Sequence, residues 1–77
     1  MKVIIYKCHD RHTDDYIKIY EYSPENLEAV KQKVINDWES PTYKSQEVHY
    51  DGWDFEYGWN EDYYSAYKIE DTLKTVE

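Results

Sequence analysis

One amphipathic helix is the clearest regular pattern in this 77-residue chain, and it limits the folds that the other segments can form. Ser23-Pro24-Glu25 has the features of a helix start: a capping hydroxyl, a proline suited to the first turn, and an acid at the positive end of the dipole. Apolar residues then recur at spacings of three and four, which places on one face Leu27, Val30, Val34 and Trp38. Ser40-Pro41 ends the pattern. The sequence therefore predicts a helix over about 24–38 that lies on a sheet.

The segments before this helix have the patterns of strands. Residues 3–6 form a short apolar run rich in β-branched side chains, which is typical of a strand inside a sheet. Residues 16–22 alternate, with two isoleucines on one face and three tyrosines on the other. Residues 8–15 are polar and form a connection. Segments 2–7 and 16–22 are therefore expected to form an antiparallel pair beneath the helix.

After the helix, Asp51-Gly52 indicates a second hairpin. Asp-Gly suits the two positive-φ positions of a type I′ turn. Residues 53–59 alternate without a break, with four aromatic side chains facing one way and Asp54, Glu56 and Gly58 facing the other. A strand at 53–59 is therefore expected to pair with one near 45–50. Gly58 is expected to mark a bulge or a close approach of two backbones.

The C-terminal segment fits two structures. A strand would place Tyr67, Ile69 and Leu73 on one face, whereas a short helix capped by Asn60 would align Ala66, Ile69, Leu73 and Val76. The strand is favoured because β-forming residues crowd the segment and a further strand completes a two-layer domain. The predicted fold is thus α+β: a single small domain over 1–77, with one helix on a mainly antiparallel sheet and a C-terminal strand or short helix.

Charge is the most unusual property of the sequence. There are 17 Asp and Glu residues against nine Lys and Arg, which gives a net charge of −8. Residues 1–38 carry six basic and seven acidic side chains, whereas residues 39–77 carry three basic and ten acidic ones. Such a chain repels nucleic acid and anionic membranes and is attracted to basic protein surfaces. We therefore interpret the first half as scaffold and the second half as the interacting surface.

No targeting or membrane segment is expected from the sequence. The N-terminal apolar run is too short for a signal peptide, and no run approaches the ~20 apolar residues of a membrane-spanning helix. The single cysteine, Cys8, cannot form an internal disulfide and suits a reducing compartment. A cytoplasmic location is therefore expected.

Neither the metal-ligating residues nor the paired acids indicate a metal or catalytic site. Residues 8–12 bring one cysteine and two histidines together, but a closed zinc site takes four ligands in spaced pairs, and His49 is the one later candidate of that type. A Cys–His nucleophile would also need an oxyanion loop and a third, orienting residue. Paired carboxylates are abundant, but so short a chain has little room for a glycosidase cleft, and solvated charge explains them. We expect no enzyme activity, metal or cofactor.

Residues 50–64 combine seven aromatic side chains with five acidic ones. Some of these aromatics are needed for the core, but so small a domain cannot enclose ten Tyr and three Trp, so others must be exposed. Exposed aromatics beside carboxylates suit a partner rich in Arg and Lys, through charge pairing and cation–π contact. One negative face with exposed aromatics within it is expected to contain Glu47, Tyr50, Asp51, Asp54, Glu56, Trp59, Glu61, Asp62, Tyr63 and Tyr64.

Spacing along a strand favours a partner that normally binds nucleic acid. Residues i and i+2 on one strand face lie about 6.8 Å apart, which is close to the ~6.8 Å rise of two phosphates along a DNA strand. Asp54 and Glu56, with Glu47 and Asp51 on the neighbouring strand, would then present anions at phosphate-like density, beside aromatics that stand in for stacked bases.

In size, charge and architecture the chain resembles small phage-encoded inhibitors of host defence nucleases, including anti-CRISPR proteins. This resemblance assigns no role to any residue. It implies an acidic protein-binding inhibitor that mimics nucleic acid in the basic groove of a host defence protein such as a CRISPR effector. Its location would then be the host cytoplasm.

A binding module for a small ligand or carbohydrate is the alternative function. Trp53, Trp59 and nearby tyrosines would form the platform, and Asp or Glu side chains would bond the hydroxyl groups of a sugar. Salt distinguishes the two functions, because docking by many charges weakens steeply with ionic strength whereas aromatic stacking on a sugar does not.

Overall fold

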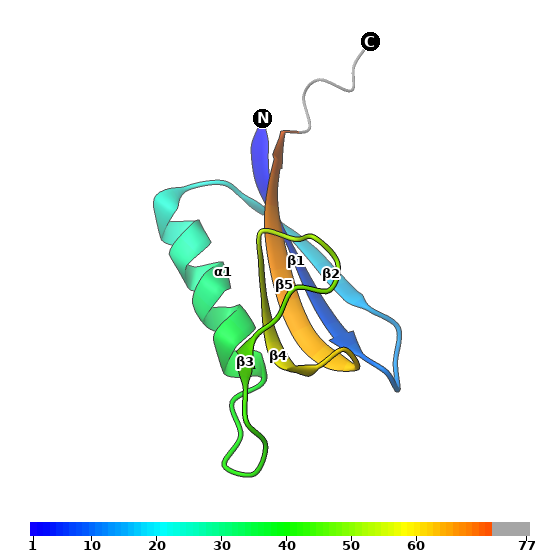
Figure 1. Ribbon diagram of the computed structural model, residues 1–77. Helices are drawn as coiled ribbons and strands as arrows, with labels where there is room; N and C mark the ends of the chain where they lie inside the picture. Colours follow the sequence, from blue (N-terminus) through cyan, green and yellow to red (C-terminus); the bar gives the residue numbers. More distant parts are fainter. Residues whose placement is uncertain (72–77) are drawn as a thin grey trace.

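The computed structural model describes residues 1–71, which form one helix and one five-stranded sheet (Figure 1). The strand order is β2-β1-β5-β4-β3, and each neighbouring pair is antiparallel. In chain order, the elements are β1 (Lys2–Asp10), β2 (Tyr16–Glu21), α1 (Pro24–Asp37), β3 (Gln46–Glu47), β4 (Phe55–Asn60) and β5 (Tyr63–Asp71). The predicted α+β fold with a mainly antiparallel sheet is confirmed. No helix in this part of the chain is both long and apolar enough to cross a membrane.

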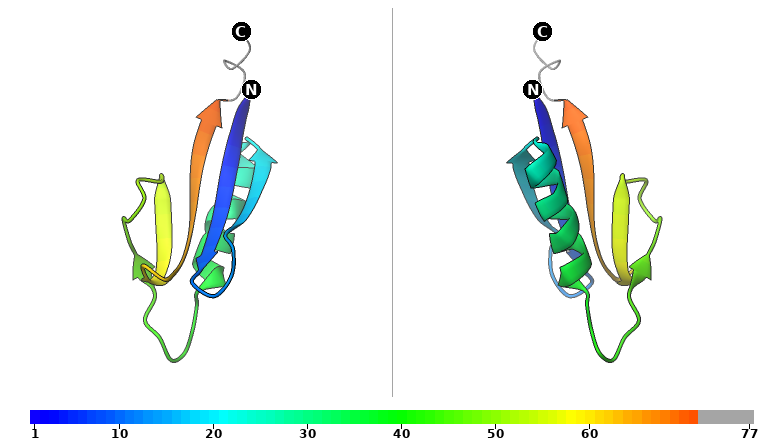
Figure 2. Two further views of the ribbon diagram at one scale, coloured as in Figure 1. Left: turned by 90° about the vertical axis from the view of Figure 1, so that its right-hand side faces the viewer. Right: turned by 90° about the vertical axis from the view of Figure 1, so that its left-hand side faces the viewer.

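Helix α1 forms where the sequence predicts it. Ser23 is the N-cap, and its hydroxyl accepts the backbone N–H of Asn26 at 3.0 Å. Figure 2 shows that the helix lies across one side of the sheet, which we call the helix side; the other is the open side. The predicted apolar stripe faces the sheet, with four buried or half-buried residues: Leu27, Val30, Val34 and Trp38.

The main core lies between α1 and the central strands. Val30 and Val34 of the helix pack against Ile4 and Tyr6 of β1, and all four side chains are buried. The other strands surround this group with half-buried side chains on the helix side: Tyr20, Phe55, Tyr57, Tyr67 and Ile69. Aromatic rings thus supply much of the apolar area that so short a chain needs.

Polar contacts fix the C-terminal end of α1 to β5. The buried Ser65 hydroxyl accepts the indole N–H of Trp38 at 2.8 Å and donates to the carboxylate of Asp37 at 2.8 Å. The hydroxyl of Tyr6 donates to the same carboxylate oxygen. Because each of these buried groups has a partner, the end of the helix can lie inside the protein without an unsatisfied polar atom.

The predicted type I′ turn at Asp51-Gly52 is wrong. Such a turn needs positive φ at both positions, but Gly52, with φ of 74°, is the sole residue with positive φ in the described part of the chain. Strand β3 has two residues and β4 begins at Phe55, so both strands are shorter than predicted. Residues 48–54 instead form a loop that lies over the open side, where Val48 and Trp53 pack against β5. Trp53 therefore leaves the alternation that sequence analysis extended from residue 53.

The C-terminal segment is a strand up to Asp71, as the favoured prediction held, and the helix alternative is wrong for these residues. Asn60 caps no helix; its side chain accepts the N–H of Asp62 at 2.8 Å in the turn between β4 and β5. Leu73, which was part of both patterns, and Val76, which was part of the helix pattern, lie outside the described residues.

Gly58 marks both a bulge and a close approach, as predicted. The register between β4 and β5 shifts between Gly58 and Asn60. A Cβ atom on Gly58 would lie 2.3 Å from the carbonyl oxygen of Tyr63 and 2.4 Å from the Cα of Tyr64. Only a residue without a side chain fits this position unless the two strands separate.

Candidate partner-binding surface

Glu56 holds the loop 48–54 on the open side of the sheet. Its side chain is fully buried, at 0% exposure. The carboxylate accepts the backbone N–H of Trp53 at 2.9 Å, of Tyr50 at 2.5 Å and of Asp51 at 3.3 Å. The expectation that Glu56 faces solvent is therefore wrong. Alternation does direct it away from the helix, but these N–H donors replace water around the carboxylate and allow the loop to cover it.

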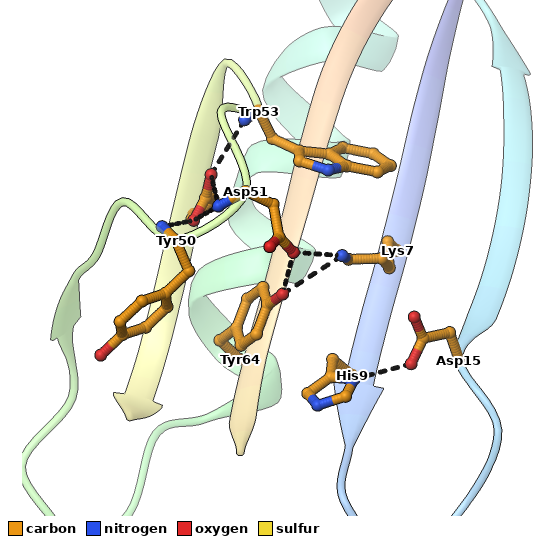
Figure 3. A network of polar contacts seen from close by, with 8 residues as sticks. Lys7, His9, Asp15, Tyr50, Asp51, Trp53 and Tyr64 are labelled. Carbon is orange, nitrogen blue, oxygen red and sulfur yellow. Dashed lines mark hydrogen bonds and ion pairs between the residues drawn. The ribbon is translucent and has the colours of Figure 1, made fainter. Parts of the chain in front are cut away.

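Above this anchor, Lys7, Asp51 and Tyr64 form a compact polar group (Figure 3). The ammonium group of Lys7 donates to Oδ2 of Asp51 at 2.6 Å and to the hydroxyl of Tyr64 at 3.2 Å. The Tyr64 hydroxyl donates to the same carboxylate oxygen. The lysine nitrogen also lies 4.9 Å from the centre of the Trp53 ring. Lys7 is 8% exposed, and these contacts compensate for the loss of water around its charge.

The surroundings of these three residues stabilise the charged forms of Lys7 and Asp51 and the neutral form of Tyr64. Burial acts to lower the pKa of Lys7, but hydrogen bonds to Asp51 and Tyr64 outweigh it and hold the pKa above its ordinary 10.5. Hydrogen bonds from Lys7 and Tyr64 hold the pKa of Asp51 below its ordinary 3.8. Burial, aided by the hydrogen bond to Asp51, raises the pKa of Tyr64 to about 12. Lys7 and Asp51 are therefore a charged pair throughout the neutral range, and Tyr64 is a neutral donor.

An open hollow of about 480 Å³ adjoins this group, and we call it the acidic hollow. It is lined by Lys7, His9, Asp15, Tyr50, Asp51, Glu61, Asp62 and Tyr64. Four carboxylates against one ammonium group leave a charge of −3 when His9 is neutral. The hollow is thus a negative surface with two tyrosines, built from β1, β5, the loop 48–54 and two turns.

Five of the ten predicted residues line the acidic hollow: Tyr50, Asp51, Glu61, Asp62 and Tyr64. The other lining residues, Lys7, His9 and Asp15, were not predicted from the sequence. β1 brings the first two to the hollow because His9 lies opposite Tyr64 in the pairing with β5. Asp15 also lies at the hollow, because its carboxylate is 2.7 Å from Nδ1 of His9. The period of two in the sequence places Lys7 and His9 on one face of a strand. However, no local sequence feature indicates that this strand pairs with residues 63–71.

The other predicted acids lie elsewhere, so the expected single negative face is wrong. Glu56 is buried beneath the loop. Glu47 lies opposite Tyr57, on the helix side of the sheet. Asp54 lies just before β4, at the end remote from the turn that carries Glu61, and its carboxylate accepts the N–H of Ile69 at 2.8 Å. The short strands and the loop between them distribute these acids over different parts of the surface.

Trp59 and Tyr63 belong to an aromatic cluster on the helix side. The ring of Trp59 lies 5.1 Å from Trp38, 5.5 Å from Tyr63 and 4.7 Å from Tyr43, between ring centres. Its indole N–H donates to the carbonyl of Trp38 at 2.7 Å. Trp53 lies on the open side, so Trp53 and Trp59 do not share one platform for a ligand.

No group of three or more His, Cys, Asp or Glu side chains is arranged to hold a metal ion within residues 1–71. No protein-family model matches the chain, and no curated protein or solved structure matches it either.

Proposed function

We propose that this protein is a small acidic inhibitor that binds a basic protein surface. In this proposal it occupies the nucleic-acid-binding groove of a host defence protein, such as a CRISPR effector, in place of nucleic acid. The observation that carries the proposal is the acidic hollow, which combines four carboxylates with two tyrosines. A net charge of −8 adds long-range attraction to any basic groove.

The hollow suits the side chain of an arginine or lysine from such a partner. Glu61 is exposed and makes no hydrogen bond or ion pair within the part of the chain that the structure describes. The carboxylate of Asp62 lies 3.7 Å from the guanidinium of Arg11, and because both side chains are exposed, water and salt weaken this contact. Both carboxylates can therefore exchange their present surroundings for a guanidinium or ammonium group at small cost.

Tyr50 supplies an aromatic anchor at the rim of the hollow. It is 47% exposed, and its backbone N–H is held by the buried Glu56 carboxylate. Its ring lies 5.6 Å from that of Tyr64. An exposed aromatic on a fixed backbone loses little entropy on binding, and Tyr is a frequent energetic centre of interfaces.

The phosphate-like array predicted on two neighbouring strands does not support the proposal, because Glu56 is buried and Glu47 lies on the other side of the sheet. The anions of the hollow come instead from three separate connections. Support for a nucleic-acid-binding partner therefore rests on the charge and on the tyrosines of the hollow.

The test measures the displacement of labelled nucleic acid from purified defence nucleases. Fluorescence anisotropy of the label monitors the displacement at low and at high salt. We expect the wild-type protein to displace the nucleic acid from its target. The double reversal Asp15→Lys with Glu61→Lys should slow association sharply at low salt, and the loss should shrink as salt is added.

The matched control is Glu28→Lys with Glu39→Lys, which changes the net charge equally at positions outside the hollow. We expect this control to retain most of the competition. Equal losses in both double variants would show that bulk charge acts rather than the hollow. Absence of displacement from every basic nuclease tested would overturn the proposal.

A further inference from the structure

Strand β2 is an open edge of the sheet, and it carries exposed apolar side chains. It is the terminal strand in the order β2-β1-β5-β4-β3. Ile17 and Ile19 are 48% and 59% exposed. Both lie on the open side, where Ile19 is opposite the half-buried Ile5 of β1. Three isoleucines thus form a small apolar strip, of which Ile17 and Ile19 are exposed.

The outer edge of β2 offers a row of backbone hydrogen-bonding groups. One of them, the carbonyl of Glu21, already accepts the side-chain N–H of Asn26 at 2.8 Å and keeps a second lone pair for a further donor. The N–H of Tyr22 donates to the carbonyl of Lys2 at 3.1 Å, so the pairing with β1 uses alternate residues counted back from Tyr22. The intervening residues, Ile17, Ile19 and Glu21, therefore direct their N–H and C=O groups away from the sheet. This edge lacks two of the usual protections against pairing, since it has no proline and its register with β1 shows no bulge; its one lysine is Lys18.

We propose that β2 pairs with β2 of a second copy of this chain, antiparallel about a two-fold axis at Ile19. Residues that face each other in an antiparallel pair lie on the same side of the sheet, so each residue must meet one of the same parity. With Ile19 opposite Ile19, Ile17 lies opposite Glu21 on both sides of the axis. Every outward backbone group of Ile17, Ile19 and Glu21 then finds a partner, with two hydrogen bonds in each facing pair.

Side chains favour this register over its neighbours. If the two-fold axis passes through Lys18 instead of Ile19, Lys18 lies opposite Lys18 of the second copy, and like charges that face each other are destabilising. If the axis passes through Tyr20, Ile19 lies opposite Glu21 and the two Ile19 side chains are separated. In the proposed register, Lys18 faces Tyr20 of the second copy. Within one chain the Lys18 ammonium already lies 5.3 Å from the Tyr20 ring, so the same cation–π contact can form across the axis.

Local charge also favours a second copy over a basic partner. Although the chain carries −8, the segment Ile17–Glu21 contains one lysine and one glutamate and is neutral. The apolar strip therefore attracts no basic groove, whereas two copies can pair there without placing like charges opposite each other. Dimerisation through β2 would join the two sheets into one and place Ile5 and Ile19 of both copies in a continuous strip.

Site-specific crosslinking tests the proposal at the level of register. In a Cys8→Ser background, Ile19→Cys places two thiols in a facing pair with Cα atoms about 5.5 Å apart, a separation that a disulfide spans. The control Ile17→Cys places them on opposite sides of the axis, about 14 Å apart along the strands. Under a mild oxidant, we expect the first variant to form a covalent dimer and the second to remain monomeric on non-reducing electrophoresis.

Sedimentation of the unmodified protein gives an independent measurement. We expect a dimer that dissociates on dilution, and Ile19→Glu should abolish it while circular dichroism shows an unchanged fold. A wild-type protein that stays monomeric at the highest attainable concentration would overturn the proposal. Crosslinking of Ile17→Cys as fast as Ile19→Cys would overturn it too, because random collision or another register would then explain the disulfide.

Discussion

At the scale of single residues, a buried carboxylate decides where the acidic surface lies. Glu56 gathers backbone N–H groups from Tyr50, Asp51 and Trp53. The loop that it holds carries Asp51 to Lys7 and leaves Tyr50 exposed at the rim of the hollow. An acid that cannot contact a partner therefore shapes the surface on which the proposed function depends.

Replacement of Glu56 by glutamine tests this role. Glu56→Gln keeps the size of the side chain but removes its charge and turns an NH₂ group towards N–H donors, so hydrogen bonds of a buried group are lost. We expect the free energy of unfolding, measured by urea denaturation, to fall by about 1–3 kcal/mol. Glu61→Gln removes one charge at an exposed position and should change the free energy of unfolding by no more than about 0.5 kcal/mol. Equal stability of the two variants would contradict the role of Glu56 as an anchor.

Part of this site could be predicted from residues alone. The acids and aromatics of 50–64 were predicted to contact a partner, and half of the residues chosen there and nearby line the hollow. The burial of Glu56 could not be predicted, because a period of two tells which side of a strand a residue faces but not what covers that side. Lys7 was missed for the same reason: the loop that buries it comes from 44 positions further along the chain.

At the scale of secondary structure, the hairpin of β4 and β5 depends on the absence of a side chain at Gly58. Gly58→Ala places a methyl group 2.3 Å from the carbonyl oxygen of Tyr63, and backbone atoms on both strands must move. We expect it to lower the free energy of unfolding by about 3 kcal/mol. Thermal or urea denaturation measures this loss.

Gly52 provides the matched control for that substitution. It has φ of 74°, and no atom lies within 4 Å of the position that a Cβ would take, so Gly52→Ala introduces backbone strain without a collision. Its cost should be about 1 kcal/mol. If Gly58→Ala proves no more costly than Gly52→Ala, β4 and β5 approach each other less closely than the structure shows.

Elements were predictable where local chemistry decides them. The start of α1 at Ser23-Pro24 and its apolar stripe follow from capping and from helical periodicity, and the first hairpin follows from two β-type runs. The prediction that residues 8–10 belong to the connection is wrong, because pairing with β5 extends β1 to Asp10. The second hairpin was predicted with the wrong turn, because Asp51-Gly52 is a local signal. Three N–H groups bound to the Glu56 carboxylate, together with the burial of Val48 and Trp53, stabilise a longer loop instead.

At the scale of the whole molecule, charge and packing oppose each other. The net charge of −8 favours expansion through self-repulsion, while a thin core of aromatic and aliphatic side chains must hold the fold together. The helix covers one side of the sheet, but a short loop covers only part of the other. Stability should therefore respond strongly to conditions that change the charge of buried groups.

The dependence of stability on pH follows from the shifted groups. The pKa values of Lys7, Tyr64 and Tyr67 are raised, so the folded state holds these protons more tightly than the unfolded chain. Their contribution is complete below the ordinary values of 10.0 and 10.5 and is lost as pH rises through the folded values. The pKa of Asp51 is lowered, so its contribution is present above 3.8 and is lost as pH falls. We expect a stability plateau between these limits.

Tyr64→Phe isolates one of these groups on the alkaline side. Because the pKa of Tyr64 rises from 10.0 to about 12 in the folded state, unfolding of the wild type in that interval releases up to one proton from this residue. The variant lacks that proton, so its free energy of unfolding should fall less steeply with pH, by up to about 1.4 kcal/mol per pH unit. Urea denaturation at a series of pH values measures both slopes, and near neutral pH the two should be parallel. Identical slopes at alkaline pH would mean that Tyr64 ionises as readily in the folded protein as in the unfolded chain, and that burial and the hydrogen bond to Asp51 do not hold its proton.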